Sequence, residues 1–514
     1  MSETKPLHIV AVAYGGWGHI RPLCTLATRL VRLRRATVTL LVSRHVYAKA
    51  AAELVRNFED GEDALQAQIR LAALDAHATD LYDYDVVGAA FAQEYPKLVR
   101  GAPMRCAHTH AELPALPPPQ ALILDLMHYA LLPIARAASA SIKVLCSGPP
   151  SILSTYLLVG TLGSRSGGRT VAEEKIEGYA AQKGLSLREA ADAMFNEPPG
   201  DVIQAAGLPP MYWYENTPQT PVIQVKLGFS RLLVIKLVNE CDAYISSSME
   251  CFEPKESVQG FSEFFARTSR KLYLLGPLMP MTKRSDAADA AQAAQSPEIV
   301  DFLQNALQKH GERSMVYMSF GTFFWTAHPE KAWAFLDVLM EKKIPFIMSH
   351  ASQLAHVPDE VKAKVKASGT GLLVPWAPQQ AILEHPATGW FVTHAGFNSI
   401  VESIYAGVPM ICWPFSADQP LNAMHITENL DIAYELFEVR TGPGLKPVHR
   451  TGKAPVGTLD AVRAEAAAVL ARAFGDDGAQ KRERVRRLRE AMLEPWQPGG
   501  AAWVAGEQLL DSLQ

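Results

Sequence analysis

The sequence predicts an α/β protein built from two doubly wound domains that face a cleft. Short apolar runs of strand length alternate with segments of helical periodicity in both halves of the chain. The chain has 514 residues, which is more than a single hydrophobic core usually serves. Residues 281–297, rich in Ala, Asp and Gln, interrupt the alternation and are typical of an interdomain linker.

The first half begins with a strand, a glycine loop, a helix and a second strand. Residues 8–13 form an apolar run, residues 15–18 read GGWG, and apolar residues then recur with helical spacing from Ile20 to Val31. Because this order joins neighbouring parallel strands, it predicts a sheet covered on both faces. Further strands of this half are expected at 37–42, 121–125, 142–146 and 271–275, with inserted helices and loops over 151–232.

The second half repeats the alternation. A helix is expected to start at Ser296-Pro297, and another spans 330–343. Strands are expected at 316–320, 346–349, 372–375, 391–393 and 410–413. The predicted domains are 1–280 and 298–495, joined by 281–297. In doubly wound sheets, ligands bind beyond the carboxyl ends of the strands, and this rule directs the search for a site.

Composition excludes several classes of function. The chain is 48% hydrophobic and 20% charged with a net charge of −4, so neither a disordered chain nor a nucleic-acid-binding surface is expected. There is no signal-peptide pattern at the start and no apolar stretch of the ~18 residues that a spanning helix needs. The six cysteines form no C-x-x-C pair, which favours a reducing cytoplasm. We expect a monomer without a transmembrane segment or nucleic-acid partner.

The glycine loop does not fit a dinucleotide site. Arg21 stands where the third glycine of G-x-G-x-x-G belongs, and the second strand ends in Ser43-Arg44-His45 instead of an acidic residue. No phosphate-binding loop of the G-x-x-x-x-G-K-[ST] type occurs either. His19 follows the glycines at a helix start, where the helix dipole favours a neutral imidazole. It is either a general base or a structural cap of the loop, and this segment alone leaves both open.

Residues 376–419 suggest a nucleotide-sugar site. A strand at 391–393 leads through His394-Ala395-Gly396 into a helix that Gly407 ends, so free backbone amides at the carboxyl end of a strand are expected to bind phosphate. Ser399 and Glu402 fit a capping box. Taken singly, such residues also have structural explanations, as helix caps or core residues. The combination carries the prediction.

Three side chains extend this site. Asp418 and Gln419 follow the next strand and suit hydrogen bonds to neighbouring sugar hydroxyls. Trp376 follows an earlier strand and suits stacking on a base.

The segment resembles, without gaps, the signature box of UDP-dependent glycosyltransferases of the plant secondary-product and animal glucuronosyltransferase type. The matching residues are Trp376, Pro378, Gln379, His385, Gly389, Thr393, His394, Gly396, Asn398, Ser399, Glu402, Gly407, Val408, Pro409, Pro414, Asp418 and Gln419. The resemblance extends to residues 16–22 and 319–322. It implies the GT-B fold, two Rossmann-like domains facing a cleft, an inverting mechanism, and a C-terminal helix, 496–514, that crosses back to the first domain.

The resemblance also implies roles for individual residues. Trp376 would stack on uracil with Gln379 near the ribose or base, and Glu402 would bind the ribose hydroxyls. His394, Asn398 and Ser399 would bind the diphosphate, and Asp418 and Gln419 the sugar. Gly18, Thr322, Ala377 and Gly396 are further expected at the co-substrate. Two departures are Phe397, where relatives carry Trp or Arg, and Cys146, where a Thr often reaches the sugar; Ser147 is a substitute there.

In the same resemblance, His19 is the general base and Asp125 orients it. Neutral imidazole takes the proton of the acceptor hydroxyl as the oxygen attacks the anomeric carbon, and the carboxylate stabilises the imidazolium. The alternative for Asp125 is the N-cap of the following helix. We expect no metal: Asp83-Tyr84-Asp85 is D-x-D in an irregular segment, and Cys106, His108 and His110 lack a fourth ligand.

The predicted function is inverting transfer of a sugar from a UDP-sugar, glucose by the presence of Gln419, to the hydroxyl of a small, largely apolar acceptor such as a phenolic natural product or xenobiotic. No cofactor is expected beyond this co-substrate. One alternative is a membrane-associated sterol or lipid glycosyltransferase, for which the apolar residues 211–214 would touch the bilayer. A second, non-enzyme alternative is a UDP-sugar-binding regulatory protein.

Overall fold

The chain divides into two compact units in the computed structural model. The structure describes residues 7–34, 36–76, 84–159, 169–196, 202–220, 222, 227–282, 287–288, 292 and 296–514. The first unit comprises Met1–Glu197, Lys226–Ser285 and Leu493–Gln514, and the second comprises Pro198–Val225 and Asp286–Met492. The grouping differs from the predicted boundaries, because 198–225 belong with the second unit. Most of the expected linker, 281–297, lies outside the described residues.

The first unit is built on a seven-stranded parallel sheet with the order β11-β10-β7-β6-β1-β2-β3. The chain runs outward from β1 to one side and then returns to start the other side at β6. The neighbouring carboxyl ends of β1 and β6 are therefore the switch point of this sheet. Its strands are β1 (Leu7–Val12), β2 (Ala36–Ser43), β3 (Ile69–Leu74), β6 (Ala121–Asp125), β7 (Lys143–Gly148), β10 (Ala243–Ser246) and β11 (Lys271–Leu274).

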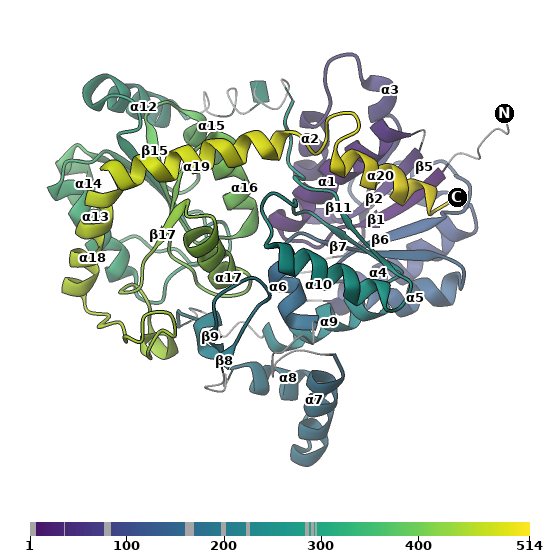
Figure 1. Cartoon of the computed structure of the whole chain (residues 1–514). Coiled ribbons are helices and arrows are strands. Elements are labelled where there is room, and N and C mark those ends of the chain that lie inside the picture. Colours follow the sequence, from purple (N-terminus) through teal and green to yellow (C-terminus); the bar gives the residue numbers. More distant parts are fainter. Residues whose placement is uncertain are drawn as a thin grey trace. The chain divides into compact units, whose positions relative to one another are not determined.

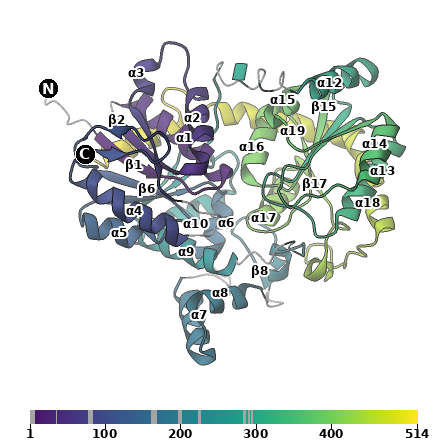
Figure 2. The same ribbon diagram turned by 180° about the vertical axis from the view of Figure 1, so that it is seen from behind.

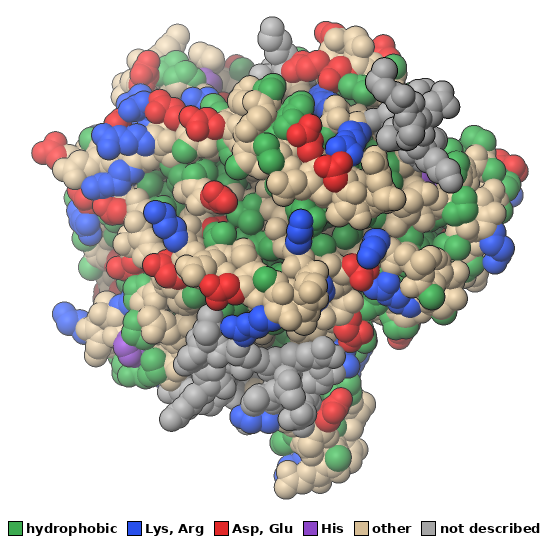
Figure 3. All heavy atoms as spheres, turned by 45° about the vertical axis from the view of Figure 1, so that its right-hand side comes forward, with side chains coloured by type: hydrophobic (Ala, Val, Ile, Leu, Met, Phe, Trp, Pro, Cys, Tyr) green, Lys and Arg blue, Asp and Glu red, His purple; other side chains and the backbone are tan. Residues whose placement is uncertain are grey.

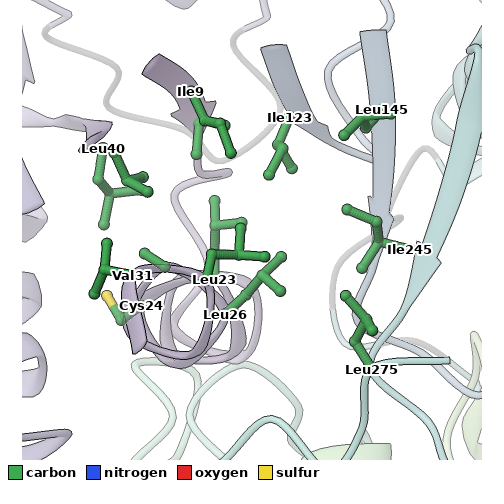
Figure 4. Close-up of a cluster of buried hydrophobic side chains, with 14 of the residues drawn as sticks. Ile9, Leu23, Cys24, Leu26, Val31, Leu40, Ile123, Leu145, Ile245 and Leu275 are labelled. Carbon is green, nitrogen blue, oxygen red and sulfur yellow. The ribbon is translucent and has the colours of Figure 1, made fainter. Parts of the chain in front are cut away.

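Apolar side chains of α1 (Trp17–Leu33) fill the core on one face of this sheet. Leu23 and Leu26 lie beneath Ile9 of β1 and Ile123 of β6 (Figure 4). Every residue of β1 is buried, as expected for a parallel strand with helices on both faces. The predicted helix therefore exists; it begins at Trp17 and contains Pro22.

Helices cover both faces of the first sheet (Figures 1 and 2). They include α20 (Ala501–Asp511), which packs against β11 and α1 within this unit. The other helices are η1 (Arg44–Val46), α2 (Tyr47–Arg56), α3 (Asp63–Gln66), α4 (Tyr84–Val99), α5 (Leu131–Ala138), α6 (Ile152–Val159), α7 (Arg169–Lys183), α8 (Leu187–Asn196), α9 (Leu227–Glu240) and α10 (Lys255–Ala266), and a small hairpin joins β4 (Met104–Arg105) to β5 (Glu112–Leu113).

The second unit carries a six-stranded parallel sheet with the order β14-β13-β12-β15-β16-β17. Its switch point lies between β12 and β15, because the chain leaves these two central strands in opposite directions. Trp390 and Trp413 are fully buried in its core. The strands are β12 (Met315–Ser319), β13 (Phe346–Ser349), β14 (Gly371–Val374), β15 (Thr388–Thr393), β16 (Met410–Cys412) and β17 (Ala433–Glu435).

The helices of this unit flank the sheet (Figure 1). They are α12 (Pro297–His310), α13 (Pro329–Glu341), α14 (Asp359–Ser368), α15 (Gln379–Glu384), α16 (Phe397–Ala406), α17 (Gln419–Met424), η3 (His425–Asn429), η4 (Gly442–Leu445), α18 (Leu459–Ala473) and α19 (Asp476–Leu493). Gly407 ends α16 in the left-handed conformation, as predicted.

A segment from the first half of the sequence packs into the second unit. It contains β8 (Val202–Ile203), β9 (Met211–Tyr212) and η2 (Trp213–Asn216). The Glu215 Oε1 accepts the backbone N–H of His449 at 3.0 Å, and the Tyr214 hydroxyl donates to the Pro447 carbonyl at 2.5 Å. Arg440 lies between Glu215 and Glu435, and all three are buried. These contacts explain why the segment belongs with residues distant in the sequence.

Within the described part of the chain, three strands of the two large sheets were not predicted from the sequence. They are β3, β10 and β17, of which β3 and β17 are edge strands. An edge strand shows less continuous apolarity, because part of it faces solvent; the first three residues of β3 are only partly buried. Because these strands were not predicted, the sequence alone did not give the strand order of either sheet.

The surface and the helices agree with the composition. On the face shown in Figure 3, basic and acidic side chains are interspersed, with no broad field of one sign. Among the helices that the structure describes, none is long and apolar enough to cross a membrane.

Candidate active site

The switch point of the first sheet brings His19 and Asp125 together. His19 lies in the first turn of α1, just after β1, and Asp125 is the last residue of β6. The imidazole Nδ1 and the carboxylate Oδ2 are 2.8 Å apart. Asp125 is buried, whereas a quarter of the His19 side chain is exposed. A buried carboxylate on Nδ1 fixes the tautomer and leaves Nε2 as the nitrogen that accepts a proton.

The second carboxylate oxygen of Asp125 holds the loop that follows β6. Oδ1 accepts the backbone N–H of Met127 at 3.0 Å. The expected alternative, the N-cap of the following helix, is wrong, because the N-cap of α5 is Ala130 and Asp125 bonds to the preceding loop and to His19. Gly18 lies in the first turn of α1, and Gly16 is the N-cap.

Aromatic residues surround the His19 side of this switch point. Tyr14 and Tyr84 are buried and cluster with Leu233, and Met127, Tyr129 and Phe229 pack against them with partly exposed side chains. Burial raises the pKa of Tyr84 to about 12, so the phenol stays neutral. This side of the site suits an apolar, aromatic ligand.

The switch point of the second sheet holds His394. Its imidazole lies against two glycines: a Cβ on Gly321 would meet the ring at 3.1 Å, and a Cβ on Gly396 would lie 2.5 Å from Nε2. Burial lowers the pKa of His394 to about 4, so the ring is neutral near pH 7. Nδ1 is buried and has no hydrogen-bond partner within the described part of the chain. A buried imidazole nitrogen without a partner makes His394 a candidate for a ligand contact.

The N-terminus of α16 lies beside this histidine. Gly396 is the N-cap without a side-chain hydrogen bond, so Asn398 and Ser399 belong to the first turn. The expected capping box from Ser399 to Glu402 is therefore wrong, because both residues lie inside the helix. Ala395 has a positive φ of 63°, an uncommon conformation for alanine that turns the chain into the helix. The N-terminus of α16, at the positive end of the helix dipole, is suited to phosphate.

Glu402, in α16, is hydrogen-bonded to Gln379 at the start of α15. The Gln379 Nε2 donates to Glu402 Oε2 at 2.5 Å and lies 3.4 Å from the Ser399 hydroxyl. Trp376 exposes 43% of its surface, which is unusual for tryptophan and excludes a core role, whereas Ala377 is buried. Thr322, exposed beside Gly321, completes the residues at this edge of the sheet.

The side chains of Asp418 and Gln419 form hydrogen bonds within the protein that the sequence did not predict. Asp418 Oδ2 accepts from Asn422 Nδ2 at 2.7 Å and from the Phe397 N–H at 3.3 Å. The buried Gln419 uses its carboxamide oxygen to accept the N–H groups of Phe415 and Ser416, at 2.9 and 3.3 Å. Any contact of Gln419 with a sugar therefore falls to its NH₂ group rather than to both ends of the amide.

The two departures from the family pattern are both interior residues. Phe397 is 4% exposed at the start of α16. Cys146 is fully buried in β7, and burial raises the pKa of its thiol far above the usual range. Ser147, the expected substitute, is also buried. A thiol held in this environment is a small apolar residue, not a sugar ligand.

The two metal-like patterns of the sequence belong to the first unit. Asp83 lies outside the described residues, and Asp85 is in the first turn of α4. Cys106 Sγ accepts the backbone N–H of Ala73 at 3.4 Å. Within the described ranges, no three His, Cys, Asp or Glu side chains are grouped as metal ligands.

Two further contributors were missed by sequence reasoning. The side chain of Asn422, in α17, donates a hydrogen bond to the Ala395 carbonyl at 3.1 Å. This bond links the turn at Ala395 and Gly396 to α17. Tyr14 packs edge-to-face with His19, their ring centroids 5.0 Å apart. Tyr14 was readable as the last residue before the glycine loop, but Asn422 carries no local signal.

Comparison with known proteins places these features in a family. Residues 187–438 match the family described as UDP-glucoronosyl and UDP-glucosyl transferase. The chain is 31% identical to UDP-glycosyltransferase eriJ of Hericium erinaceus, with 100% of both chains covered. It is 40% identical to anthocyanidin 3-O-glucosyltransferase UFGT of Vitis vinifera, over 27% of this chain and 31% of that protein.

Solved structures show the same fold. Phytolacca americana UGT2, complexed with UDP-2-fluoro-glucose and pterostilbene, gives a TM-score of 0.65 at 19% identity, covering 99% of this chain and all of that one. A ugt transferase from Siraitia grosvenorii in complex with UDP gives 0.68 at 18%, covering 99% of each. The chain is 31% identical to one relative over the full length of both and has two parallel sheets of this order. It therefore belongs to the UDP-glycosyltransferase family and is an enzyme with the GT-B fold.

Proposed function

We propose that the enzyme transfers glucose from UDP-glucose, with inversion and without a metal ion, to the hydroxyl of a small phenolic acceptor. The observation that carries the proposal is the His19–Asp125 pair at the first switch point. The second switch point supplies the neutral His394 and the amide-rich turn of α16 for a diphosphate. The anthocyanidin named in one relative is a phenolic acceptor.

In the proposed reaction His19 Nε2 takes the proton of the acceptor hydroxyl. The acceptor oxygen forms a bond to the anomeric carbon while the bond from that carbon to the β-phosphate oxygen breaks, and UDP leaves with the electron pair. Attack from the side opposite the leaving group inverts the anomeric centre. Asp125 stabilises the imidazolium, because its carboxylate is buried and only 2.8 Å from Nδ1.

The donor is proposed to lie along the edge of the second sheet. Trp376 presents an exposed ring for stacking on uracil, and Glu402 with Gln379 faces the ribose hydroxyls. His394, Asn398 and Ser399 take the diphosphate, with Gly396 leaving room for the imidazole. Asp418 and the NH₂ group of Gln419 take the sugar hydroxyls. Thr322 and Ala377 complete this edge of the second unit, and Gly18 of the first unit stays a predicted co-substrate residue.

The acceptor is proposed to be aromatic because of the residues beside His19. Met127, Tyr129 and Phe229 offer partly exposed apolar surface next to the buried Tyr14 and Tyr84. The membrane-bound alternative is not favoured, since Met211 and Tyr214 are buried in the second unit instead of forming an exposed apolar patch. We also propose a reducing compartment such as the cytoplasm, because the six cysteines are free thiols.

Replacement of His19 tests the proposal. His19→Ala should lower kcat with a phenol acceptor by ~10²–10⁴-fold, the usual effect of losing a positioned base. UDP affinity, measured by calorimetry, should stay at the wild-type value, and the exposed His45→Ala should behave as wild type in both assays. Wild-type turnover by His19→Ala would remove the base from the mechanism.

A further inference from the structure

Tyr14 lies between two imidazoles at the first switch point. Its ring centroid is 5.0 Å from that of His19 and 5.7 Å from that of His128, with interplanar angles of 65° and 68°. Gly16 packs against both Tyr14 and His19: a Cβ there would touch the two rings at 3.4 to 3.6 Å. The order Tyr14-Gly15-Gly16 thus lets the chain turn while the two rings stay in contact.

A second tyrosine fixes the Tyr14 ring. Tyr84 of α4 stacks on it at 6.3 Å with an interplanar angle of 25°, and the two side chains share a hydrogen bond. The Tyr84 hydroxyl is also 3.0 Å from the Ser230 hydroxyl of α9. Tyr14 and Tyr84 are only 6% and 4% exposed. The ring beside the base is therefore held by side chains from two further helices.

The groups near the His19 and Tyr14 rings differ in charge. Asp125 is the anion on Nδ1. Burial lowers the pKa of His128, which keeps that second imidazole neutral, and burial keeps Tyr84 neutral even though Arg188 lowers its pKa slightly. An imidazolium forming on His19 therefore lies beside the Asp125 carboxylate and the Tyr14 ring. Aromatic faces attract cations within about 6 Å of the centroid.

We propose that Tyr14 is a positioning residue whose ring, in T-shaped contact with His19, stabilises the imidazolium formed during transfer. This inference rests on the proposed role of His19 as the base. Asp125 fixes the tautomer, and Tyr14 favours the protonated form of the same ring from a second direction. The two act on different parts of the imidazole, so their effects are separable by experiment.

The test uses the pH dependence of kcat/KM with a simple phenol, whose hydroxyl ionises near pH 10, far from the acid limb that reports the base. Tyr14→Phe should keep the wild-type midpoint of that limb. Tyr14→Leu should lower the midpoint by ~0.4–1.5 pH units, the range of a cation–π contact, and should lower kcat more than it changes KM. Thermal unfolding of each variant identifies any that fail to fold.

A graded series removes dependence on the leucine variant. At position 14, phenylalanine, 4-fluorophenylalanine and 3,5-difluorophenylalanine keep the shape of the ring and progressively weaken its π face, so the midpoint should fall stepwise. The same series at Tyr95, a buried tyrosine of α4 that stacks on Phe91, should not move it. A midpoint unchanged across the position 14 series overturns the inference. If His19→Ala retains wild-type turnover, the proposed function fails instead, and the two failures are distinguished.

Discussion

The contact between Gly396 and His394 gives a quantitative prediction for donor binding. In Gly396→Ala the new Cβ would lie 2.5 Å from His394 Nε2, whereas ordinary contact begins near 3.4 Å, so the imidazole must move by 3.4 − 2.5 = 0.9 Å. The backbone tolerates the change, because Gly396 has φ −65° and ψ 141°. The variant therefore displaces the ring without straining the turn.

A displacement of this size breaks a hydrogen bond from His394 to a phosphate, because the donor–acceptor distance of such bonds varies by only about 0.5 Å. A hydrogen bond to a charged group contributes ~1.5–3 kcal/mol, which corresponds to a ~10–150-fold weaker affinity. We therefore expect Gly396→Ala to raise the Kd of UDP by that factor. Isothermal titration calorimetry with UDP alone measures it without any acceptor.

Two controls make the reasoning refutable. Gly178→Ala, in the exposed helix α7 with no atom within 4 Å of the new Cβ, should leave UDP affinity unchanged. In the His394→Ala background, Gly396→Ala should have little further effect, because the displaced ring is gone. Wild-type affinity in Gly396→Ala, or an undiminished effect without His394, would refute the assignment of His394 to the diphosphate.

Three further outcomes are expected. With UDP-glucose, UDP-galactose and UDP-glucuronic acid competing at equal concentration for one phenol, the glucoside should dominate, because glucuronate would bring a carboxylate to Asp418; a dominant galactoside or glucuronide contradicts this. EDTA should leave the rate unchanged, and loss restored by Mn²⁺ would contradict metal independence. Arg440→Met should lower the free energy of unfolding in urea by ~3–5 kcal/mol, because the buried Glu215 loses its ion pair with Arg440, while Glu435 keeps its pair with Arg450.

Stability should also depend on pH through His394. Its folded-state pKa of about 4 lies below the ordinary value of 6.5, so the unfolded chain takes up the proton first as the pH falls. The free energy of unfolding therefore falls between pH 6.5 and 4. His394→Gln should reduce that slope by up to about 1.4 kcal/mol per pH unit, the effect of one proton. Equal slopes for both proteins would show that His394 is not held neutral.

The sequence alone determined the features that lie within one stretch of chain. The strand, glycine loop and helix around His19 fall in consecutive residues, as do β15, the turn at Gly396 and α16. Apolar periodicity and glycine are local signals, so they predicted the fold class and most strands. The turn at Gly396 was likewise predicted, although the capping box was wrong, because Gly396 is the N-cap of α16 and Ser399 lies inside the helix.

Only the tertiary structure decided which distant residues meet. Tyr14 contacts Tyr84, and Glu215 contacts Arg440 across more than two hundred positions, which joins 198–225 to the second unit. The structure also shows that the Gln419 oxygen, which was expected at the sugar, accepts a hydrogen bond from the backbone N–H of Phe415. Such pairings have no periodicity in sequence, because burial and charge complementarity select them only after the strands have brought the segments together.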